Sequence, residues 1–545
     1  MTVGRGPVRA RRRCVPGAAV WWIRAPKLGV QHSCEWLGAA ANISVVRLCR
    51  YTGPKMKLGA VVQHLHPNLL ALFLTQVRNH PDDPALVWRH TEISYRQLHE
   101  RVCGAQHRLD RLHLPPGAPV AVRAVKSPDT IALILALLGD GRPFLLPPAD
   151  LPEATFDALV AAAGCRAVLE PEEITPVAGE LRVVDRPGAA CFLLTTSGST
   201  GIPKIVPLSA AGVGRFTAWA AARFNIGPHR TVLNYAPLNF DLCLLDIWTT
   251  LAFGGRVVLV EPEHATRARY LHDLVERYDG NVVQGVPMLF HLLGELNRPL
   301  PSVTQVIATG DALTARGLAA LPGLFPNARL HNLYGCTETN DSFLHEIDPA
   351  TDHTPLPIGR EVCGVDAVLV DANGAVLHGP GVGELYVSTP FQTEGYTDAA
   401  LTAAAFGPHP DGANDRTYFR SGDLVRRAAD GTLTLEGRAD FHVKVRGVRV
   451  NTQAVERTLL ELDEVAGAVV FAVPDQVAGS ALHAVVHRRD PQSLHSLAVR
   501  AHCARRLSRA AVPTAIQLTD EPLPTTSTGK PDRARIKQTY LEGQR

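Results

Sequence analysis

From Met56 onward, segments in which apolar residues recur at helical spacing alternate with short runs rich in β-branched residues. The helical pattern covers Leu69 to Val77 and Tyr95 to Leu109, whereas Pro119 to Val122 and Arg256 to Val260 have the pattern of buried strands. Strands separated by helices are usually parallel, and the loops after their carboxyl ends form binding sites. The pattern therefore predicts an α/β fold with its functional residues in loops that follow strands.

The pattern changes in the last third of the chain. Asp371 to Gly374 and Asp430-Gly431 each lie between β-rich runs and predict tight hairpin turns. After Arg438 a shorter series of strand and helix patterns follows, over Phe441 to Val450, Thr452 to Leu462, Ala466 to Val473, Leu482 to His487 and Leu494 to Leu507. A chain of 545 residues is too long for one hydrophobic core. We expect a large N-terminal domain, 56–439, of α/β subdomains plus a β-rich subdomain, and a small mobile α+β C-terminal domain, 440–545.

The first 55 residues differ from the rest. Five arginines lie within the first 13 residues, well before the first acidic residue, Glu35. The apolar stretch Val15 to Ile23 contains Pro16 and Gly17 and has no convincing cleavage site. We expect residues 1–55 to be an extension that is disordered or lies upstream of the true start at Met56. A targeting peptide is the alternative.

Charge and cysteine content exclude several classes of protein. Lysine and arginine number 55 against 52 aspartate and glutamate residues, so no strongly basic field favours nucleic acid. The apolar run Ile131 to Leu138 is far shorter than the roughly 20 residues that span a bilayer. Ten scattered cysteines without a CxxC pair suit reduced thiols and argue against a structural zinc site. We therefore expect a cytoplasmic protein that binds neither nucleic acid nor a membrane.

The stretch "TTSGSTGIPK", Thr195 to Lys204, directly follows the apolar run Ala190 to Leu194. Its five hydroxyl side chains, two glycines and terminal lysine offer backbone N–H groups, hydroxyls and a positive charge, which a polyphosphate needs. It is not the GxxxxGK[ST] nucleotide loop, because Gly198 and Gly201 stand too close together and Ile205 follows Lys204. By itself the segment could also be a flexible connector.

Five further motifs accompany it in order: "NLYGCTET" at 332–339, "GELYVS" at 383–388, "YFRSGDL" at 418–424, "GRADFHVKVRGVRV" at 437–450 and "TSTGKPDR" at 526–533. Together they resemble the signatures of the adenylate-forming superfamily, which includes acyl- and aryl-CoA ligases, luciferases and the adenylation domains of nonribosomal peptide synthetases. The resemblance extends over roughly residues 65 to 540 and is nearest to stand-alone amino acid adenylation enzymes. It implies that a carboxylate attacks the α-phosphorus of ATP, with Mg²⁺, and forms an acyl-adenylate.

The resemblance also assigns roles to residues of the nucleotide site. It implies that the loop formed by Thr195, Thr196, Ser197, Gly198, Ser199, Thr200, Gly201 and Lys204 closes on the β- and γ-phosphates. Glu338 matches the Mg²⁺ ligand, Tyr334 the residue on the adenine and Thr337 the one that reaches the α-phosphate. Two alternatives stay open. Glu338 could be a carboxylate at the start of a helix, and Asp423, which the resemblance assigns to the ribose, could instead form a turn.

Four more assignments complete that site. Asp423 matches the residue that binds the ribose hydroxyls, and Arg438 the arginine that helps hold the nucleotide where the domains meet. Lys530 matches the lysine that bridges the substrate carboxylate, the ribose and the α-phosphate, unless it is a solvated surface lysine. Asp440 matches the hinge about which the small domain rotates for thioester formation.

By the same resemblance, Asp241 in "NFDLCLLDIW" pairs with the ammonium group of an amino acid substrate. A helix cap for a helix starting at Leu242 is the alternative. The rest of the pocket is assigned to Leu242, Leu245, Gln284, Ile307, Thr309, Leu333, Asp341 and Ser342. This set suggests a small or polar amino acid, or a diamino acid whose second cationic group meets Asp341.

No carrier-protein attachment motif follows residue 540, so we expect a free-standing enzyme. It would pass its product to the phosphopantetheine thiol of a separate carrier protein, or to coenzyme A. An acid:CoA ligase for an amine-free acid and a non-catalytic scaffold are the alternatives, the second disfavoured because Lys530, Glu338, Asp423 and Lys204 are all present.

Overall fold

The computed structural model describes residues 68–149, 151–170, 172–184, 189–196, 203–438, 441–445, 448–475, 479–490, 494–507, 509, 511–526 and 530–543, and three short N-terminal strands. These strands, β1 (Arg12–Val15), β2 (Ala18–Trp21) and β3 (Cys34–Glu35), pair antiparallel in a unit that is separate from Val62–Arg545. The rest of the predicted 1–55 extension lies outside the described residues. The domain boundaries given above stay predictions.

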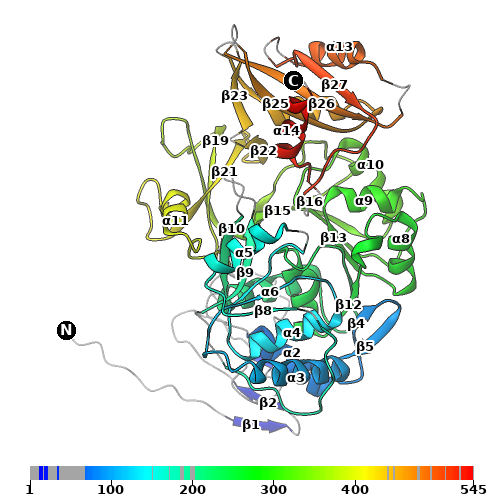
Figure 1. Ribbon diagram of the computed structural model, residues 1–545, viewed down its shortest axis with the longest axis vertical. Coiled ribbons are helices and arrows are strands. Elements are labelled where there is room, and N and C mark those ends of the chain that lie inside the picture. The colour runs from blue at the N-terminus through cyan, green and yellow to red at the C-terminus, as the bar shows by residue number, and fades with distance from the viewer. Residues whose placement is uncertain are drawn as a thin grey trace, which may run out of the picture. The chain divides into compact units, whose positions relative to one another are not determined.

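A nine-stranded sheet forms the centre of the large domain (Figure 1). Its strands, in spatial order, are β17 (Arg360–Glu361), β16 (Asn340–Ile347), β15 (Arg329–Cys336), β14 (Gln305–Thr309), β13 (Val282–Gly285), β11 (Thr231–Asn234), β12 (Arg256–Leu259), β4 (Pro84–Trp88) and β5 (Thr91–Ser94). The strands from β15 to β4 run parallel, and antiparallel strands flank them on both sides. The predicted α/β architecture is therefore confirmed.

The two faces of this sheet are covered by different helices. Val283, Val306 and Leu330 pack with residues of α8 (Ala268–Arg277), α9 (Pro287–Gly294) and α10 (Ala315–Leu324). Ile307 and Leu333 belong instead to the core shared with α2 (Leu69–Asn79), α6 (Ala210–Phe224), the π-helix η1 (Leu244–Thr249) and α7 (Thr250–Phe253). A sheet buried on both faces explains why its strands read as continuous apolar runs.

A second sheet holds the strand before the predicted phosphate loop. Its order is β10 (Lys204–Ser209), β9 (Ala190–Thr196), β7 (Phe144–Leu145), β6 (Val120–Val122) and β8 (Val168–Leu169), and it is accompanied by α3 (Tyr95–Arg111), α4 (Pro128–Gly139) and α5 (Glu153–Ala162). Phe192 of β9 contacts Phe144 and, at 5.6 Å between ring centroids, Trp248 of η1. This aromatic packing fixes the phosphate-loop strand against the helix that follows Asp241.

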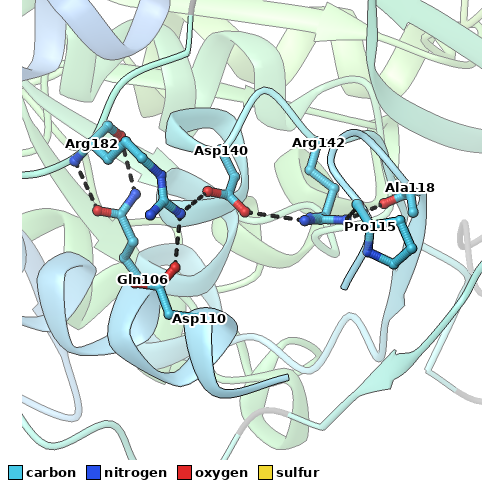
Figure 2. Close-up of polar contacts among 7 residues, drawn as sticks. All are labelled: Gln106, Asp110, Pro115, Ala118, Asp140, Arg142 and Arg182. Atoms are coloured by element: carbon cyan, nitrogen blue, oxygen red, sulfur yellow. Dashed lines mark hydrogen bonds and ion pairs between the residues drawn. The ribbon is translucent and has the colours of Figure 1, made fainter. Parts of the chain in front are cut away.

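A polar network ties the segment before β9 to two helices of this subdomain. Figure 2 shows it among Gln106, Asp110, Pro115, Ala118, Asp140, Arg142 and Arg182. Arg182 donates to Asp110 at 2.9 Å and to Asp140, and its backbone exchanges hydrogen bonds with the Gln106 amide. Arg142, only 6% exposed, donates to the carbonyls of Pro115 and Ala118. Hydrogen bonds of this kind hold irregular chain in place without a sheet.

The β-rich subdomain contains β18 (Asp366–Val370), β19 (Gly381–Ser388), β20 (Phe406–Pro408), β21 (Thr417–Arg427) and β22 (Leu433–Arg438), with α11 (Ala399–Ala405) beside them. Both predicted turns are confirmed. Gly374 has φ +86° and its N–H donates to Asp371, and Gly431 has φ +85° in the hairpin that joins β21 to β22. These are left-handed conformations that favour glycine.

The C-terminal elements are β23 (His442–Val445), β24 (Val448–Asn451), α12 (Thr452–Leu460), β25 (Val465–Asp475), β26 (Gly479–Arg488), α13 (Ser496–Arg506), β27 (Ala515–Thr519) and α14 (Arg533–Glu542). They have a core of their own, and Figure 1 shows β25, β26, β27, α13 and α14 gathered together. Phe441 to Val450, read from the sequence as one strand pattern, contains the paired strands β23 and β24. Both strands alternate with period two, so the sequence pattern did not separate them.

Among the described residues, no helix combines the length and the apolar composition needed to cross a bilayer. The seven cysteines between Cys103 and Cys503 form no disulfide.

Candidate active site

The motif "YGCTET" forms the end of β15 and the turn into β16. Gly335 lies so close to the returning strand that an added Cβ would stand 2.3 Å from the carbonyl oxygen of Asn340, and Asn340 itself has φ +54°. Only glycine fits such an approach. Glu338 therefore lies in a hairpin turn, and the alternative that it begins a helix is wrong.

Glu338 is 8% exposed and is held through one carboxylate oxygen. Its Oε1 accepts the Tyr396 hydroxyl at 2.7 Å and the Thr196 hydroxyl at 3.5 Å, whereas Oε2 has no hydrogen bond to any described residue. Mg²⁺ prefers carboxylate oxygens. A buried carboxylate with one anchored and one available oxygen fits the predicted metal ligand.

Lys204 lies next to this carboxylate. Its Nζ is 5.0 Å from the centroid of the Tyr396 ring, whose hydroxyl is bound to Glu338. Lys204 also pairs in register with Thr196 across β10 and β9, so both ends of the phosphate loop are anchored in one ladder. The predicted loop residues between them, Ser197, Gly198, Ser199, Thr200 and Gly201, lie outside the described residues, as does the predicted hinge Asp440.

Tyr334, Asp423 and Arg438 meet on the other side of the hairpin. The Tyr334 hydroxyl donates to Asp423 Oδ2, and Arg438 Nη1 donates to Asp423 Oδ1 at 3.2 Å. Burial and the Asp423 carboxylate raise the pKa of Tyr334, which keeps its proton on that bond. Asp423 belongs to strand β21, so the alternative that it forms a turn is wrong. The structure brings these three residues, predicted to bind adenine, ribose and nucleotide, into one cluster.

Asp241 follows β11 and faces the same hairpin. Its Oδ2 accepts the Thr337 hydroxyl at 2.8 Å. Thr337, which is predicted to contact the α-phosphate, is therefore bonded to Asp241, which is predicted to contact the substrate ammonium group. Burial raises the pKa of Asp241, and the Thr337 bond and the charge of Lys530 oppose that shift. The next helix is η1, which begins at Leu244 without a side-chain cap, so the proposed capping of a helix at Leu242 is wrong.

Lys530 comes from the C-terminal elements and lies exposed within electrostatic range of Asp241. The last motif of the chain is thus brought close to the strand ends of the large sheet. Such a position fits a lysine that acts on a substrate bound beside Asp241.

Four of the predicted pocket residues share one face of the large sheet. Gln284 is the partner of Ile307 across β13 and β14, and Thr309 is the partner of Leu333 across β14 and β15. Paired residues point to the same side of a sheet, and residues two apart along a strand do as well. All four are buried, and the face they form is the one covered by η1, which contributes the buried Leu245.

Asp341 and Ser342 lie at a bulge in β16. Phe343 pairs with Tyr334 and Asp341 with Gly335, so Ser342 is the extra residue. The Ser342 hydroxyl is already engaged with the Asn340 carbonyl and with Thr339 inside the hairpin. Leu242 and Asp341 are half-buried, and Leu242 offers its carbonyl to Gln284. The assignment of these residues to substrate contacts stays a prediction.

Three residues of the site were missed from the sequence. Tyr396 connects Glu338 with Lys204, Asp246 accepts hydrogen bonds from Gln284 at 2.9 Å and Asn234 at 3.2 Å, and Lys126 donates to the carbonyls of Asn234 and Tyr235. Burial lowers the pKa of Lys126 to about 8. A lone aspartate and a lone lysine within apolar runs were the available signals, because buried charges need partners.

Comparison with known proteins agrees with this geometry. The sequence pattern of AMP-binding enzymes matches residues 73–188 and 170–397, and that of the AMP-binding enzyme C-terminal domain matches residues 454–530. The chain belongs to the AMP-binding enzyme family. The predicted superfamily, and with it an AMP-forming ligase that uses ATP, is thereby confirmed.

Curated relatives in this family include two enzymes named L-proline--[L-prolyl-carrier protein] ligase. The one from Streptomyces coelicolor is 34% identical over 363 residues, which cover 64% of this chain and 66% of the relative. The one from Pseudomonas fluorescens is 30% identical over 502 residues, covering 85% of this chain and 97% of the relative. Phenyloxazoline synthase MbtB of a Mycobacterium species is 30% identical, and the chain spans only 41% of its length.

Solved structures show the same fold. A four-domain nonribosomal peptide synthetase bound to AMP and glycine superposes with a TM-score of 0.76 at 24% identity, over 87% of this chain and 36% of that chain. The amide bond synthetase McbA from Marinactinospora thermotolerans gives 0.75 at 23% identity, over 87% of this chain and all of that chain (100%). The predicted combination of a large domain and a smaller C-terminal domain is confirmed.

Proposed function

We propose that this AMP-binding enzyme activates the carboxylate of an amino acid and passes the acyl group to the phosphopantetheine thiol of a separate carrier protein. In the first step a carboxylate oxygen bonds to the α-phosphorus of ATP, and the bond from that phosphorus to the bridging oxygen breaks, which releases pyrophosphate. In the second step the thiol sulfur bonds to the carbonyl carbon and AMP leaves.

The observation that carries the amino acid assignment is Asp241. Asp241 is half-buried and forms no ion pair with a described residue. Such a carboxylate is costly to keep charged, and an incoming α-ammonium group would supply a partner. Thr337 anchors the carboxylate at 2.8 Å, and Lys530, whose charge acts on Asp241, is exposed. The names of the two prolyl-carrier protein ligases support both the amino acid and the carrier protein.

The first step brings two anions together, so the site must neutralise charge as it develops. Lys204 and Lys530 supply positive charge from segments far apart in the sequence. Glu338 would hold Mg²⁺, which would supply further positive charge to the phosphates. Tyr334, Asp423 and Arg438 form a ready cluster for the nucleoside. These roles are implied by the resemblance, and the contacts of Lys204 and Glu338 with Tyr396, and of Asp423 with Tyr334 and Arg438, support them.

The test is substrate-dependent exchange of labelled pyrophosphate into ATP, measured with L-proline, other amino acids, diamino acids and a set of amine-free acids. We expect a signal with an amino acid that is lost in Asp241→Ala. Glu346→Gln is the control, because Glu346 is exposed on β16 and, among the described residues, forms an ion pair with Arg223 alone, at 3.4 Å. A signal confined to amine-free acids, unchanged in Asp241→Ala, would refute the proposal.

The acceptor needs its own experiment. The adenylate would be formed in the presence of a phosphopantetheinylated carrier protein or of coenzyme A, and the thioesters would be compared by mass spectrometry. Loading of the carrier supports the proposal, and acylation of coenzyme A alone contradicts its second step.

A further inference from the structure

Asp341 lies among other carboxylates on the site face of the sheet. The bulge in β16 places it opposite Gly335, and its charge interacts with those of both Asp241 and Asp246. Asp246 is in turn bound to Gln284, so all four side chains gather on the side of the sheet covered by η1. The bulge therefore brings an acid from β16 to the acid that follows β11.

Asp341 has no hydrogen-bond or ion-pair partner in the part of the chain that the structure describes. Among the described residues no side chain or backbone group donates a hydrogen bond to it and no lysine or arginine forms an ion pair with it. Lys126, the buried cation of this region, donates instead to the carbonyls of Asn234 and Tyr235, and Lys530 lies exposed near Asp241. A half-buried carboxylate without a described partner in the chain is open to a cation from outside it.

The other polar groups on this face are also unable to serve it. Both hydrogens of the Gln284 amide are used, one on the Leu242 carbonyl and one on Asp246, so Gln284 can offer only its oxygen. The hydroxyl of Thr309, a residue only 5% exposed on the same face, has no hydrogen bond to a described residue. This face of the sheet therefore offers the Gln284 oxygen as an acceptor and the Thr309 hydroxyl, which has no partner among the described residues.

Two neighbouring acids cannot both be charged without added positive charge. Burial and the Asp241 carboxylate raise the pKa of Asp341 to about 8. An amino acid with one ammonium group would neutralise Asp241 and leave Asp341 unpaired. A side chain that carries a second cation would neutralise both.

We propose that the substrate is an amino acid with a second cationic group, bound by Asp341, while Asp241 binds the α-ammonium group. This inference rests on the proposed amino acid activation. Asp341 is the specificity-determining residue, and Thr309 and the Gln284 oxygen are the further polar contacts of the side-chain cation.

The test compares isosteric pairs in the pyrophosphate exchange assay, with 2,3-diaminopropionate against 2-aminobutyrate, 2,4-diaminobutyrate against norvaline, and ornithine against norleucine. Each pair differs by a terminal ammonium in place of a methyl group. We expect the wild type to prefer at least one diamino acid over its isostere by about 100-fold in kcat/KM, because a buried charge pair is at stake. Asp341→Asn should abolish this preference and retain or improve activity with the uncharged isostere.

Glu346→Gln, which removes an exposed carboxylate from the same strand, should keep the wild-type preference. The inference is overturned if the wild type favours every uncharged isostere, or L-proline, over the diamino acids. That result would leave amino acid activation intact, whereas activation of amine-free acids alone would refute the proposed function as well. The wild-type comparison decides the matter even if Asp341→Asn fails to fold.

Discussion

Tyr396→Phe removes a single oxygen atom from the contact between Glu338 and the Lys204 side chain. The ring that Lys204 Nζ approaches at 5.0 Å remains, and so does the edge-to-face contact with Phe406. The hydrogen bond of 2.7 Å to Glu338 Oε1 is lost. The Thr196 hydroxyl, at 3.5 Å, is then the one remaining described donor to that oxygen.

The size of the effect follows from the charge and burial of the acceptor. A hydrogen bond to a charged group contributes about 1.5–3 kcal/mol. Because Tyr396 and Glu338 are both only 8% exposed, water is a poor replacement for the lost hydroxyl. Loss of a group that orients a metal ligand typically weakens metal affinity or activity by about 10- to 100-fold. We expect the Mg²⁺ concentration for half-maximal activity to rise by about tenfold, which corresponds to about 1.4 kcal/mol.

The assay is pyrophosphate exchange at saturating ATP and amino acid, with free Mg²⁺ varied over three decades. High Mg²⁺ should restore most of the rate in Tyr396→Phe, because the variant weakens binding of the metal and retains Lys204. Thermal unfolding of the same samples measures the structural part of the effect.

Tyr418→Phe is the matched control. Tyr418 is buried and donates to the Asp366 carboxylate at the same distance, 2.7 Å, within the β-rich subdomain. It should lose a comparable amount of stability without a change in the Mg²⁺ dependence. An unaltered Mg²⁺ requirement in Tyr396→Phe, together with a lowered midpoint of unfolding, would refute the role given to Tyr396.

Three further predictions concern the same site. Lys530→Ala should slow adenylation by about 100- to 1,000-fold with an unchanged melting temperature, because Lys530 is exposed; an unchanged exchange rate would refute its role. Thr337→Val should raise KM for the amino acid by about tenfold, since it removes the donor 2.8 Å from Asp241, and steady-state exchange kinetics measure this. Without substrate, Asp341→Asn should be more stable than the wild type by an amount that grows from pH 4 to pH 8 and then levels off. The pKa of Asp341 is about 8 in the folded protein against a usual 3.8, so the unfolded chain releases this proton first and rising pH destabilises the native state. Urea unfolding of both proteins at several pH values measures the difference in stability, and a difference that does not change with pH would contradict the prediction.

The elements with strong periodicity were determined by the sequence alone. The helix expected over Leu69 to Val77 is α2, and that over Tyr95 to Leu109 is α3, where Ser94 and Gln97 form a capping box. The turns at Gly374 and Gly431 follow from residues that tolerate φ > 0. Local chemistry decides such features, so they can be predicted without knowledge of distant contacts.

The motifs were visible for the same reason, since each lies within one short segment. Lys204, Glu338, Asp423 and Lys530 are recognised from their immediate neighbours. The sequence could not show that Thr337 holds Asp241, that Tyr396 binds Glu338, or that Asp341 lacks a partner among the described residues. These contacts join different strands and loops, and the order of strands in the sheet decides which of them meet.

Tertiary structure also decided which alternatives were wrong. Glu338 and Asp241 both precede segments that could have been read as helix starts, but the close approach of Gly335 to Asn340 makes a hairpin, and η1 begins beyond Asp241. The bulge at Ser342 then turns Asp341 toward Asp241. A one-residue shift of register changes which side chains share a face, and this depends on the packing of a whole sheet rather than on any local pattern.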